Sequence, residues 1–393
     1  MSAGIVVVGG GMAGCAAAWA LAERGEACTV VESTHPGNPA GGSSGTSRMF
    51  RRMYSDAYYA RLARASLRAW RRLEADSGNT LLAECGLLFF GDRGEKDSVE
   101  GNIPGARRVM REQNVPFDEP DTERIAARWP LRPPENSEGL FEATAGTLHS
   151  RRALEVMAGR AVRAGADFLN NETVTGIHGA ASGRRPLTVT LRSGRVLAAD
   201  RVVLAAGAWT NRLLAHLGFR IRMELWGMLW AHYAVDASLA ASYPQWFCFK
   251  PPSGADEGLY YGFPAEGDPP VIKTGVDWCP PAMRATDPDR LPDAPDPEVA
   301  RLLDTFLHTH LTGVRHCVGR YVSPYAMTAD NGFVLDTVPA DRRITVFAGD
   351  CGHAFKFAPV LGHLMADLVL GRPPAIDPAP LSITRDAVGL TAI

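Results

Sequence analysis

Three glycines near the N-terminus constrain the fold of this chain more than any other feature. Gly9, Gly11 and Gly14 have the spacing G-x-G-x-x-G, and they lie between the apolar run GIVVVGG and a helical segment rich in small residues. The first glycine permits a tight turn, the second lets the backbone approach a phosphate, and the third lets the helix pack closely on the strand. The pattern predicts a parallel βαβ unit.

An acidic residue strengthens this prediction. Glu32 closes the second apolar strand, in the segment CTVVES, 18 residues after Gly14. A carboxylate there accepts hydrogen bonds from a ribose and disfavours a 2′-phosphate, while a pyrophosphate would lie at the helix N-terminus. We therefore expect FAD or NAD rather than NADP. The alternative is a glycine-rich turn in an unrelated α/β fold.

The composition excludes several classes of protein. A chain of 393 residues is long enough for two or three domains, and its net charge of −2 provides no basic surface for nucleic acid. No apolar run is long enough for a membrane span, and no secretory signal is visible at the N-terminus. The seven scattered cysteines form neither a disulfide framework nor a zinc-ligand pattern. We expect a soluble, cytoplasmic protein without a metal site.

The chain alternates between two kinds of segment. A long helix is expected around YSDAYYARLARASLRAWRRLEADSG, with Ser55 as its N-cap, and a shorter one near Ala106–Gln113. Residues 223–322 are expected to form strands and loops, and a last helix to begin at about Gly362. This alternation predicts a nucleotide-binding domain of residues 1–82, 149–222 and 323–393. A substrate domain of residues 83–148 and 223–322 would be interleaved with it.

Lysine is scarce in this chain. Of 41 basic residues only Lys96, Lys250, Lys273 and Lys356 are lysines, so arginine serves at almost every site that needs a positive charge. Lys356 stands in a nearly uncharged segment, GDCGHAFKFAPVLGHLMADLVLG. Lys273 and Lys356 are therefore candidates for special roles, whereas Lys96 and Lys250 have the context of ordinary surface residues.

The segments GSSGTSRMFRRMY, LYYGFP and GHAFKF and the isolated Lys273 resemble those of the sarcosine oxidase and N-methyltryptophan oxidase family. This family belongs to the D-amino-acid oxidase superfamily of flavoproteins, and the resemblance covers nearly the whole chain. It implies FAD as cofactor, bound by a Rossmann-like domain of the glutathione-reductase type, beside an antiparallel-sheet substrate domain. It also implies hydride transfer from a carbon next to an amine to flavin N5, hydrolysis of the imine product and reduction of O2 to H2O2.

The resemblance assigns roles to five residues. Arg51 and Lys356 match the ligands of the substrate carboxylate, Lys273 matches the lysine that promotes reaction with oxygen, Tyr261 matches an active-site tyrosine, and Arg48 would lie beside the flavin. If Arg48 and Arg51 lay on a helical turn, they would share a face. The alternatives are a solvated basic turn, especially for Arg52, a surface lysine for either lysine, and a core aromatic for Tyr261.

The cofactor-binding residues implied by the glycine pattern and the resemblance together are Gly9, Gly11, Met12, Ala13, Gly14, Glu32, Ser44, Ser47, Arg48, Val174, Gly207, Trp209, Gly352, Ala354, Phe355 and Lys356. His353 is as compatible with a structural role as with a functional one. Some of Trp226, Trp230, Tyr233, Trp246, Phe247 and Trp278 could line a substrate pocket, and the others would be core.

The chain departs from the family pattern at several positions. Ser323 stands where the family has the cysteine that is tethered to flavin, so we expect non-covalent FAD, with Cys317 and Cys351 as the other candidates for a tether. Ser44 replaces a histidine, and Asp277 stands near another differing position. These changes argue against sarcosine itself and favour a specialised substrate, for example from secondary metabolism.

The sequence thus predicts an FAD-dependent oxidase of a small amino acid with a secondary or substituted amine, or of a cyclic imino acid. Its partners would be that substrate and O2, in a monomer or homodimer. The alternatives are a dehydrogenase of the same fold with another acceptor, a primary amino-acid or glycine oxidase, and a flavin-binding protein without activity.

Overall fold

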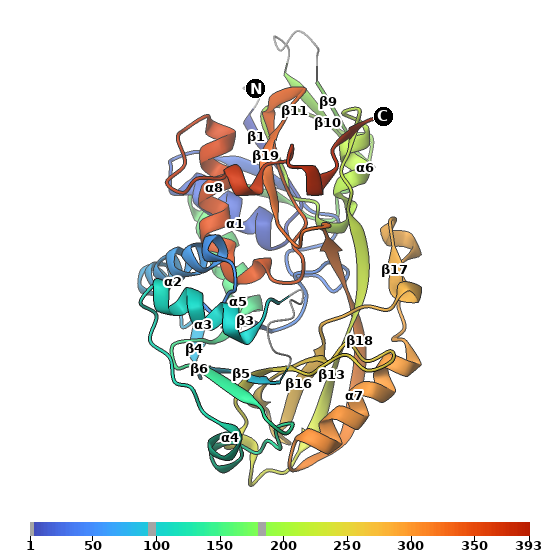
Figure 1. The fold of residues 1–393 in the computed structure, drawn as a ribbon. Coiled ribbons are helices and arrows are strands. Elements are labelled where there is room, and N and C mark those ends of the chain that lie inside the picture. Colours follow the sequence, from blue (N-terminus) through green and yellow to red (C-terminus); the bar gives the residue numbers. More distant parts are fainter. Residues whose placement is uncertain (1–3, 93–99, 180–185) are drawn as a thin grey trace.

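A parallel sheet forms the upper half of the molecule in Figure 1. The computed structural model describes residues 4–92, 100–179 and 186–393. Strand β1 (Gly4–Val8) pairs in parallel with β2 (Cys28–Val31) and β11 (Val196–Leu204). Next to these lie β8 (Asp167–Leu169) and β20 (Asp341–Ala348), also parallel. The sheet is extended by the antiparallel strands β9 (Val174–His178), β10 (Leu187–Leu191) and β19 (Val334–Val338).

The first helix is buried because small side chains let its neighbours approach. Helix α1 (Met12–Ala22) packs against α8 (Ala358–Leu370) and α5 (Ser150–Arg163). A Cβ on Gly362 of α8 would lie 2.4 Å from the Ala16 carbonyl oxygen, so only glycine permits this approach. Helix α2 (Ala57–Ser77) lies against α8 in turn, which places the start of α8 between two helices.

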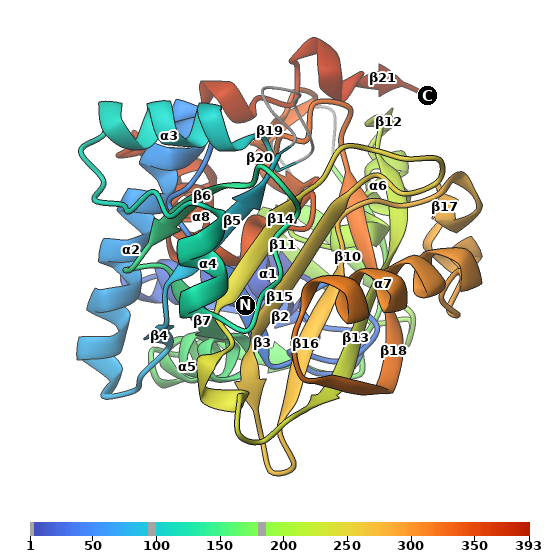
Figure 2. The ribbon, with the colours of Figure 1, turned by 60° about the horizontal axis from the view of Figure 1, so that its bottom comes forward.

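A second, mainly antiparallel sheet forms the lower half (Figure 1). Its strands run in the order β17-β13-β16-β15-β14-β5-β6, and β18 pairs with β13. Their bounds are β5 (Leu87–Gly91), β6 (Glu138–Glu142), β13 (Glu224–Val235), β14 (Gln245–Phe249), β15 (Leu259–Glu266), β16 (Val271–Val276), β17 (Arg284–Ala285) and β18 (Val314–Met327). Helix α7 (Pro297–His310) lies across one face of this sheet (Figure 2).

The remaining elements are short. Strands β3 (Ser47–Phe50), β4 (Leu82–Glu84) and β7 (Gly146–His149) form a small sheet, and β12 (Phe219–Arg220) pairs with β21 (Thr391–Ala392). Helices α3 (Ile103–Glu112), α4 (Thr122–Arg128) and α6 (Thr210–Ala215) complete the fold. The fold class is confirmed. The domain boundaries stay a prediction, and β18 runs across the one at residues 322 and 323.

Four local predictions were wrong. The carboxylate of Asp56, not Ser55, caps α2 by accepting the Tyr58 and Tyr59 N–H groups, since the Ser55 hydroxyl is bound to the backbone of Asn102. Helix α8 begins four residues before Gly362, and α3 begins before Ala106. Helix α7 lies within residues 223–322, which were expected to form strands and loops. The signal for α7 was present, since the Asp296 side chain caps it and proline occupies its first turn.

Candidate functional site

The glycine turn has the geometry that a dinucleotide requires. Gly9 has φ +102°, and a Cβ there would lie 2.4 Å from the Ala205 carbonyl oxygen. A Cβ on Gly14 would lie 1.7 Å from the carbonyl oxygen of Gly9. No other residue fits at either position without moving the backbone, and the turn opens directly into α1. The described residues therefore fit the pyrophosphate of a dinucleotide.

Glu32 is placed beside this turn. Its carboxylate is buried at the end of β2 and accepts the Gly10 N–H at 2.7 Å and the Ser33 hydroxyl at 2.8 Å. Met12 donates its N–H to the Ser43 hydroxyl at 2.9 Å, which ties the start of α1 to the following loop. Ala13 is buried in the first turn of the same helix.

Two other predicted cofactor residues follow β11. Gly207 and Trp209 form a short 3-10 turn two residues beyond Ala205, the residue that contacts Gly9. Val174, at the start of β9, and Trp209 both pack against the apolar cluster that contains Val31. The contacts of these residues with a cofactor stay a prediction.

A cavity brings the five predicted catalytic residues together, although they come from separate parts of the chain. Arg48 comes from β3, Arg51 from the segment that follows it, Tyr261 from β15, Lys273 from β16 and Lys356 from the turn before α8. The cavity is also lined by Gly42, Ser44, Met49, Glu100, Trp230, Phe247, Phe263, Asp277, Ser323, Tyr325, Gly352, His353 and Phe355. Ser47 and Ala354 lie next to lining residues.

The position of Lys356 is held by hydrogen bonds from α2 to its backbone. Its carbonyl oxygen accepts hydrogen bonds from the Ser66 hydroxyl at 2.6 Å and the Trp70 indole at 2.9 Å, both on α2. The residue is 5% exposed, and its ammonium donates to the His353 carbonyl at 3.0 Å. Burial, assisted by the nearby Arg51 charge, lowers the pKa of Lys356 to about 8. No ion pair with Lys356 is formed among the described residues, so its buried ammonium would gain from an anion in the cavity.

Lys273 lies at another wall of the cavity. Its ammonium donates to the Ser47 carbonyl at 3.1 Å and lies 5.0 Å from the ring centres of both Trp230 and Phe263. Burial lowers the pKa of Lys273 well below its usual range, and the Arg48 charge lowers it further. An anion that forms beside this lysine would be stabilised, because it would relieve the cost of the buried charge.

Arg48 and Arg51 do not share a helical turn. Arg48 lies in β3, and its guanidinium donates to the Ser47 carbonyl at 2.8 Å and the Gly42 carbonyl at 2.9 Å. Arg51 is 2% exposed, lies over the Tyr54 ring at 4.2 Å and donates to the Met53 carbonyl. The helical interpretation was wrong because Ser47–Phe50 pairs with β7 as a strand.

Two further basic residues form ion pairs with acids of the chain. Arg52 donates to the fully buried carboxylate of Glu142 through its backbone N–H at 2.9 Å and its side chain at 2.6 Å. Lys250 is 27% exposed and pairs with Asp256 at 3.2 Å. Both bind structural acids outside the cavity. Lys96 lies outside the described residues.

The sequence singled out only some of the important cavity residues. Asp277, mentioned only as a departure from the family pattern, is buried, and its Oδ2 lacks a hydrogen-bond partner among the described residues. Burial raises the pKa of Asp277 to about 6, against the opposing charges of Arg51 and Lys356. Glu100, which no motif marked, forms an ion pair with Arg51. Tyr325, two residues after Ser323, also lines the cavity and was missed.

The aromatic residues divide between the cavity and the core. Trp230 and Phe247 line the cavity, and the Trp230 indole donates to the Ser323 hydroxyl at 2.9 Å. Trp246 and Tyr233 are buried in the core cluster of the second sheet, Trp278 packs edge-on against Tyr260, and Trp226 lies against Arg284. Tyr261 also lines the cavity, and its role there stays a prediction.

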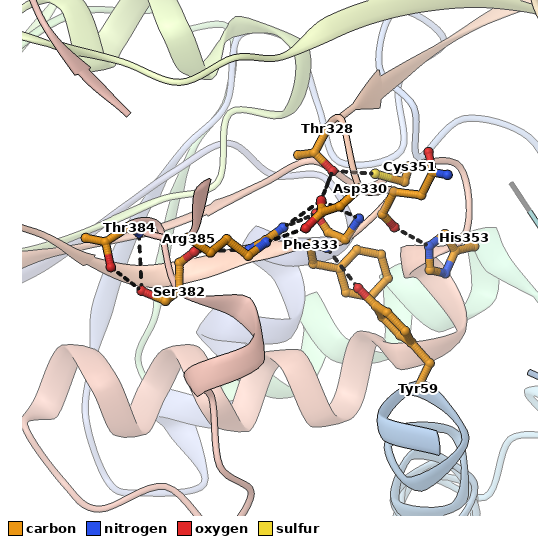
Figure 3. A network of polar contacts seen from close by, with 11 residues as sticks. Tyr59, Thr328, Asp330, Phe333, Cys351, His353, Ser382, Thr384 and Arg385 are labelled. Carbon is orange, nitrogen blue, oxygen red and sulfur yellow. Dashed lines mark hydrogen bonds and ion pairs between the residues drawn. The ribbon is translucent and has the colours of Figure 1, made fainter. Parts of the chain in front are cut away.

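The turn that carries Lys356 is held in place by a polar network (Figure 3). The Cys351 thiol contacts the Thr328 hydroxyl at 3.5 Å, and His353 Nε2 lies 3.3 Å from the Asn331 carbonyl oxygen. Thr328 also binds Asp330 at 3.0 Å, and Asp330 pairs with Arg385 at 2.7 Å. Through Arg385, the C-terminal segment thus helps to hold the turn that carries His353 and Lys356 in the cavity wall.

Comparison with known proteins agrees with this geometry. The family model for FAD-dependent oxidoreductases matches residues 4–368. The chain belongs to this family. As an FAD-dependent oxidoreductase it is an enzyme. Within its described residues, no helix has the length and apolar character needed to cross a bilayer.

The relatives of this oxidoreductase include amino acid oxidases. It is 28% identical to N-methyl-L-tryptophan oxidase of Yersinia pestis (strain Pestoides F), over 97% of this chain and 98% of the relative. The structure of NikD, described as an unusual amino acid oxidase essential for nikkomycin biosynthesis, is 31% identical, with a TM-score of 0.86 and 96% of each chain covered. L-proline dehydrogenase from P. horikoshii shares the fold with a TM-score of 0.79 at 21% identity, over 99% of this chain and 98% of that one.

Proposed function

We propose that this oxidoreductase oxidises the C–N bond of a small amino acid whose amine is secondary or otherwise substituted, or of a cyclic imino acid. The observation that carries this proposal is the cavity in which two buried cations, Arg51 and Lys356, accompany a buried acid, Asp277. Such a site is complementary to a zwitterion, since it can bind a carboxylate and an ammonium at once. The similarity to NikD favours a specialised substrate, as in secondary metabolism.

The protein groups prepare the substrate for hydride loss. Arg51 and Lys356 would hold its carboxylate and so orient the carbon next to nitrogen. The amine must be neutral, because a protonated nitrogen has no lone pair to stabilise the positive charge that develops. Asp277, with its raised pKa, is placed to accept that proton. FAD, when bound, supplies the two-electron acceptor for the hydride.

We assign the reaction with oxygen to Lys273. A buried ammonium stabilises the negative charge that O2 acquires as it takes up electrons, and H2O2 would be the product. The alternative is a dehydrogenase of the same fold that uses another acceptor. Peroxide formed under air, measured against turnover with an artificial dye, separates the two.

We further propose that FAD is bound without a covalent bond, which the family comparison leaves open. Ser323 carries no thiol, and the Cys351 thiol contacts Thr328 and is not among the residues that line the cavity. Acid precipitation should therefore release all flavin into the supernatant. Flavin in the pellet would contradict the proposal and direct attention to Cys317 or Cys351. The cytoplasmic location and the monomeric or homodimeric state stay predictions from the sequence.

The decisive experiment is anaerobic bleaching of the flavin by a panel of N-substituted, cyclic and primary amino acids. Bleaching by secondary or cyclic amino acids, but not by the same amines without a carboxylate, is the expected result. Equal bleaching by carboxylate-free amines would overturn the carboxylate clamp. Faster bleaching by glycine would favour a primary amino-acid oxidase, and no bleaching by any member would favour a flavin-binding protein without activity.

A further inference from the structure

The arginine assigned to the substrate carboxylate already holds a carboxylate of the chain itself. Arg51 Nη2 forms an ion pair with Glu100, and its Nη1 donates to the Met53 carbonyl. The side chains of Arg51 and Glu100 are 2% and 13% exposed. A buried guanidinium without an anion is strongly unfavourable, so this pairing stabilises the ligand-free cavity.

Glu100 also stands where two cavities meet. Glu100 and His353 line the cavity described above, and they line a second, outer cavity as well. The outer cavity is walled by residues of the α2 and α3 starts and of the loop after β18, namely Tyr54, Ser55, Asp56, Tyr59, Gly101, Asn102, Pro104, Gly105, Arg108, Asp330 and Asn331. The Arg51–Glu100 pair therefore lies at the boundary between the two spaces.

The backbone next to Glu100 is held firmly. The Asn102 N–H donates to the Ser55 hydroxyl at 3.0 Å, and that hydroxyl lies 3.1 Å from the Asn102 carbonyl oxygen. Gly101 has φ +83°, and a Cβ there would lie 2.3 Å from the Ser55 hydroxyl. The close approach of these two segments fixes the point from which the Glu100 side chain extends.

We propose that Glu100 occupies the carboxylate position on Arg51 in the free enzyme and is displaced by the carboxylate of the incoming substrate. This inference rests on the proposed role of Arg51 as a substrate ligand. Exchange of one carboxylate for another keeps the buried arginine paired throughout. A neutral molecule cannot make this exchange, so Glu100 keeps Arg51 paired at the boundary between the cavities until an acid arrives.

The proposal predicts whether a substitution of Glu100 strengthens or weakens the binding of a carboxylate. If Glu100 holds Arg51 for nine-tenths of the time, only about a tenth of the molecules are ready to bind, and the apparent affinity for a carboxylate is weakened about tenfold. Glu100→Gln keeps the shape and removes the charge, so it should strengthen carboxylate binding by about this factor. If Glu100 instead bound the substrate ammonium, binding of the amino acid would weaken.

The experiment uses the FAD-loaded protein and two probes, benzoate and its uncharged counterpart benzamide. Dissociation constants are measured from the change in the flavin absorption spectrum. We expect E100Q to bind benzoate about tenfold more tightly than the wild type and benzamide with unchanged affinity, while E100D stays close to the wild type for both. Glu112→Gln, which removes an exposed acid of α3, is the matched control and should change neither constant.

Thermal unfolding distinguishes this role from a merely structural one. E100Q leaves Arg51 unpaired, so it should melt lower without ligand, and benzoate should raise its melting temperature more than that of the wild type. Unchanged or weaker benzoate binding by E100Q, including no binding by either protein, would overturn the proposal. If Arg51→Gln does not weaken benzoate binding to either the wild type or E100Q, the carboxylate clamp itself fails instead.

Discussion

Lys356→Met provides the most direct test of the carboxylate clamp. Methionine fills a similar volume but carries no charge, and the backbone contacts of residue 356 with Ser66 and Trp70 do not depend on the side chain. The substitution removes one hydrogen bond between charged groups in a site where Lys356 is 5% exposed. Such a bond contributes about 1.5–3 kcal/mol. At about 1.4 kcal/mol per factor of ten, the affinity for the carboxylate should fall about tenfold to 150-fold.

The assay is steady-state turnover of the best substrate from the amine panel. We expect KM to rise by the factor above, together with the dissociation constant of benzoate measured from the flavin spectrum. Lys250→Met is the matched control, since Lys250 pairs with Asp256 and does not line the cavity. A KM within twofold of the wild type, at equal flavin content, would refute the assignment of Lys356 as a carboxylate ligand.

Three shorter predictions concern the other cavity groups. Lys273→Met should slow reoxidation of the flavin by O2 far more than its reduction by substrate in stopped-flow experiments, and equal slowing would contradict the assigned role. Burial raises the pKa of Asp277 to about 6, so kcat/KM should fall as the pH drops below about 6 because the proton acceptor is then occupied. The Asp277→Asn enzyme should turn over slowly at every pH, and its kcat/KM should not fall further below pH 6. An unchanged pH profile would exclude Asp277 as the base. Ser323→Cys places a thiol where the family has its flavin tether, so part of the flavin should stay with acid-precipitated protein; complete release would show that Ser323 is not at the tethering position.

The sequence predicted the parts of the molecule that depend on local patterns. The glycine turn imposes its backbone geometry through three nearby residues, so Gly9 and Gly14 could be interpreted without a structure. The scarcity of lysine marked Lys273 and Lys356, and both lie in the cavity. In each case the signal was contained within a short segment.

Contacts between distant segments could not be predicted in the same way. Arg52 binds Glu142 and Arg51 binds Glu100, and in neither case does a motif join the partners. Their pairing depends on how β3, the start of α3 and β6 are placed together by the fold. The wrong prediction at α7 has a different cause, since the capping residue Asp296 and the apolar spacing after it are local signals, but residues 223–322 were interpreted as one segment of strands and loops.

The choice of lysine at position 356 in an arginine-rich chain has a physical reason that can be tested. Burial lowers the pKa of Lys356 to about 8 from its usual 10.5. Between these two values the unfolded chain binds a proton that the folded chain does not, so the free energy of unfolding rises with pH through this window. The rise amounts to at most about 3.5 kcal/mol, because each pKa unit corresponds to about 1.4 kcal/mol. Arginine keeps its proton in both states and cannot relieve the cost of burial in this way.

Lys356→Arg should therefore be less stable than the wild type, and the deficit should grow as the pH rises from 8 to 10. The measurement is thermal unfolding of the two FAD-loaded proteins side by side across this range, so that groups common to both cancel. A constant difference between the proteins would show that the buried ammonium does not lose its proton. In that case the preference for lysine would have to come from its shape, since the larger planar guanidinium has less room beside Tyr54 and Phe357, whose ring centres lie 5.6 Å and 5.7 Å from the Lys356 nitrogen.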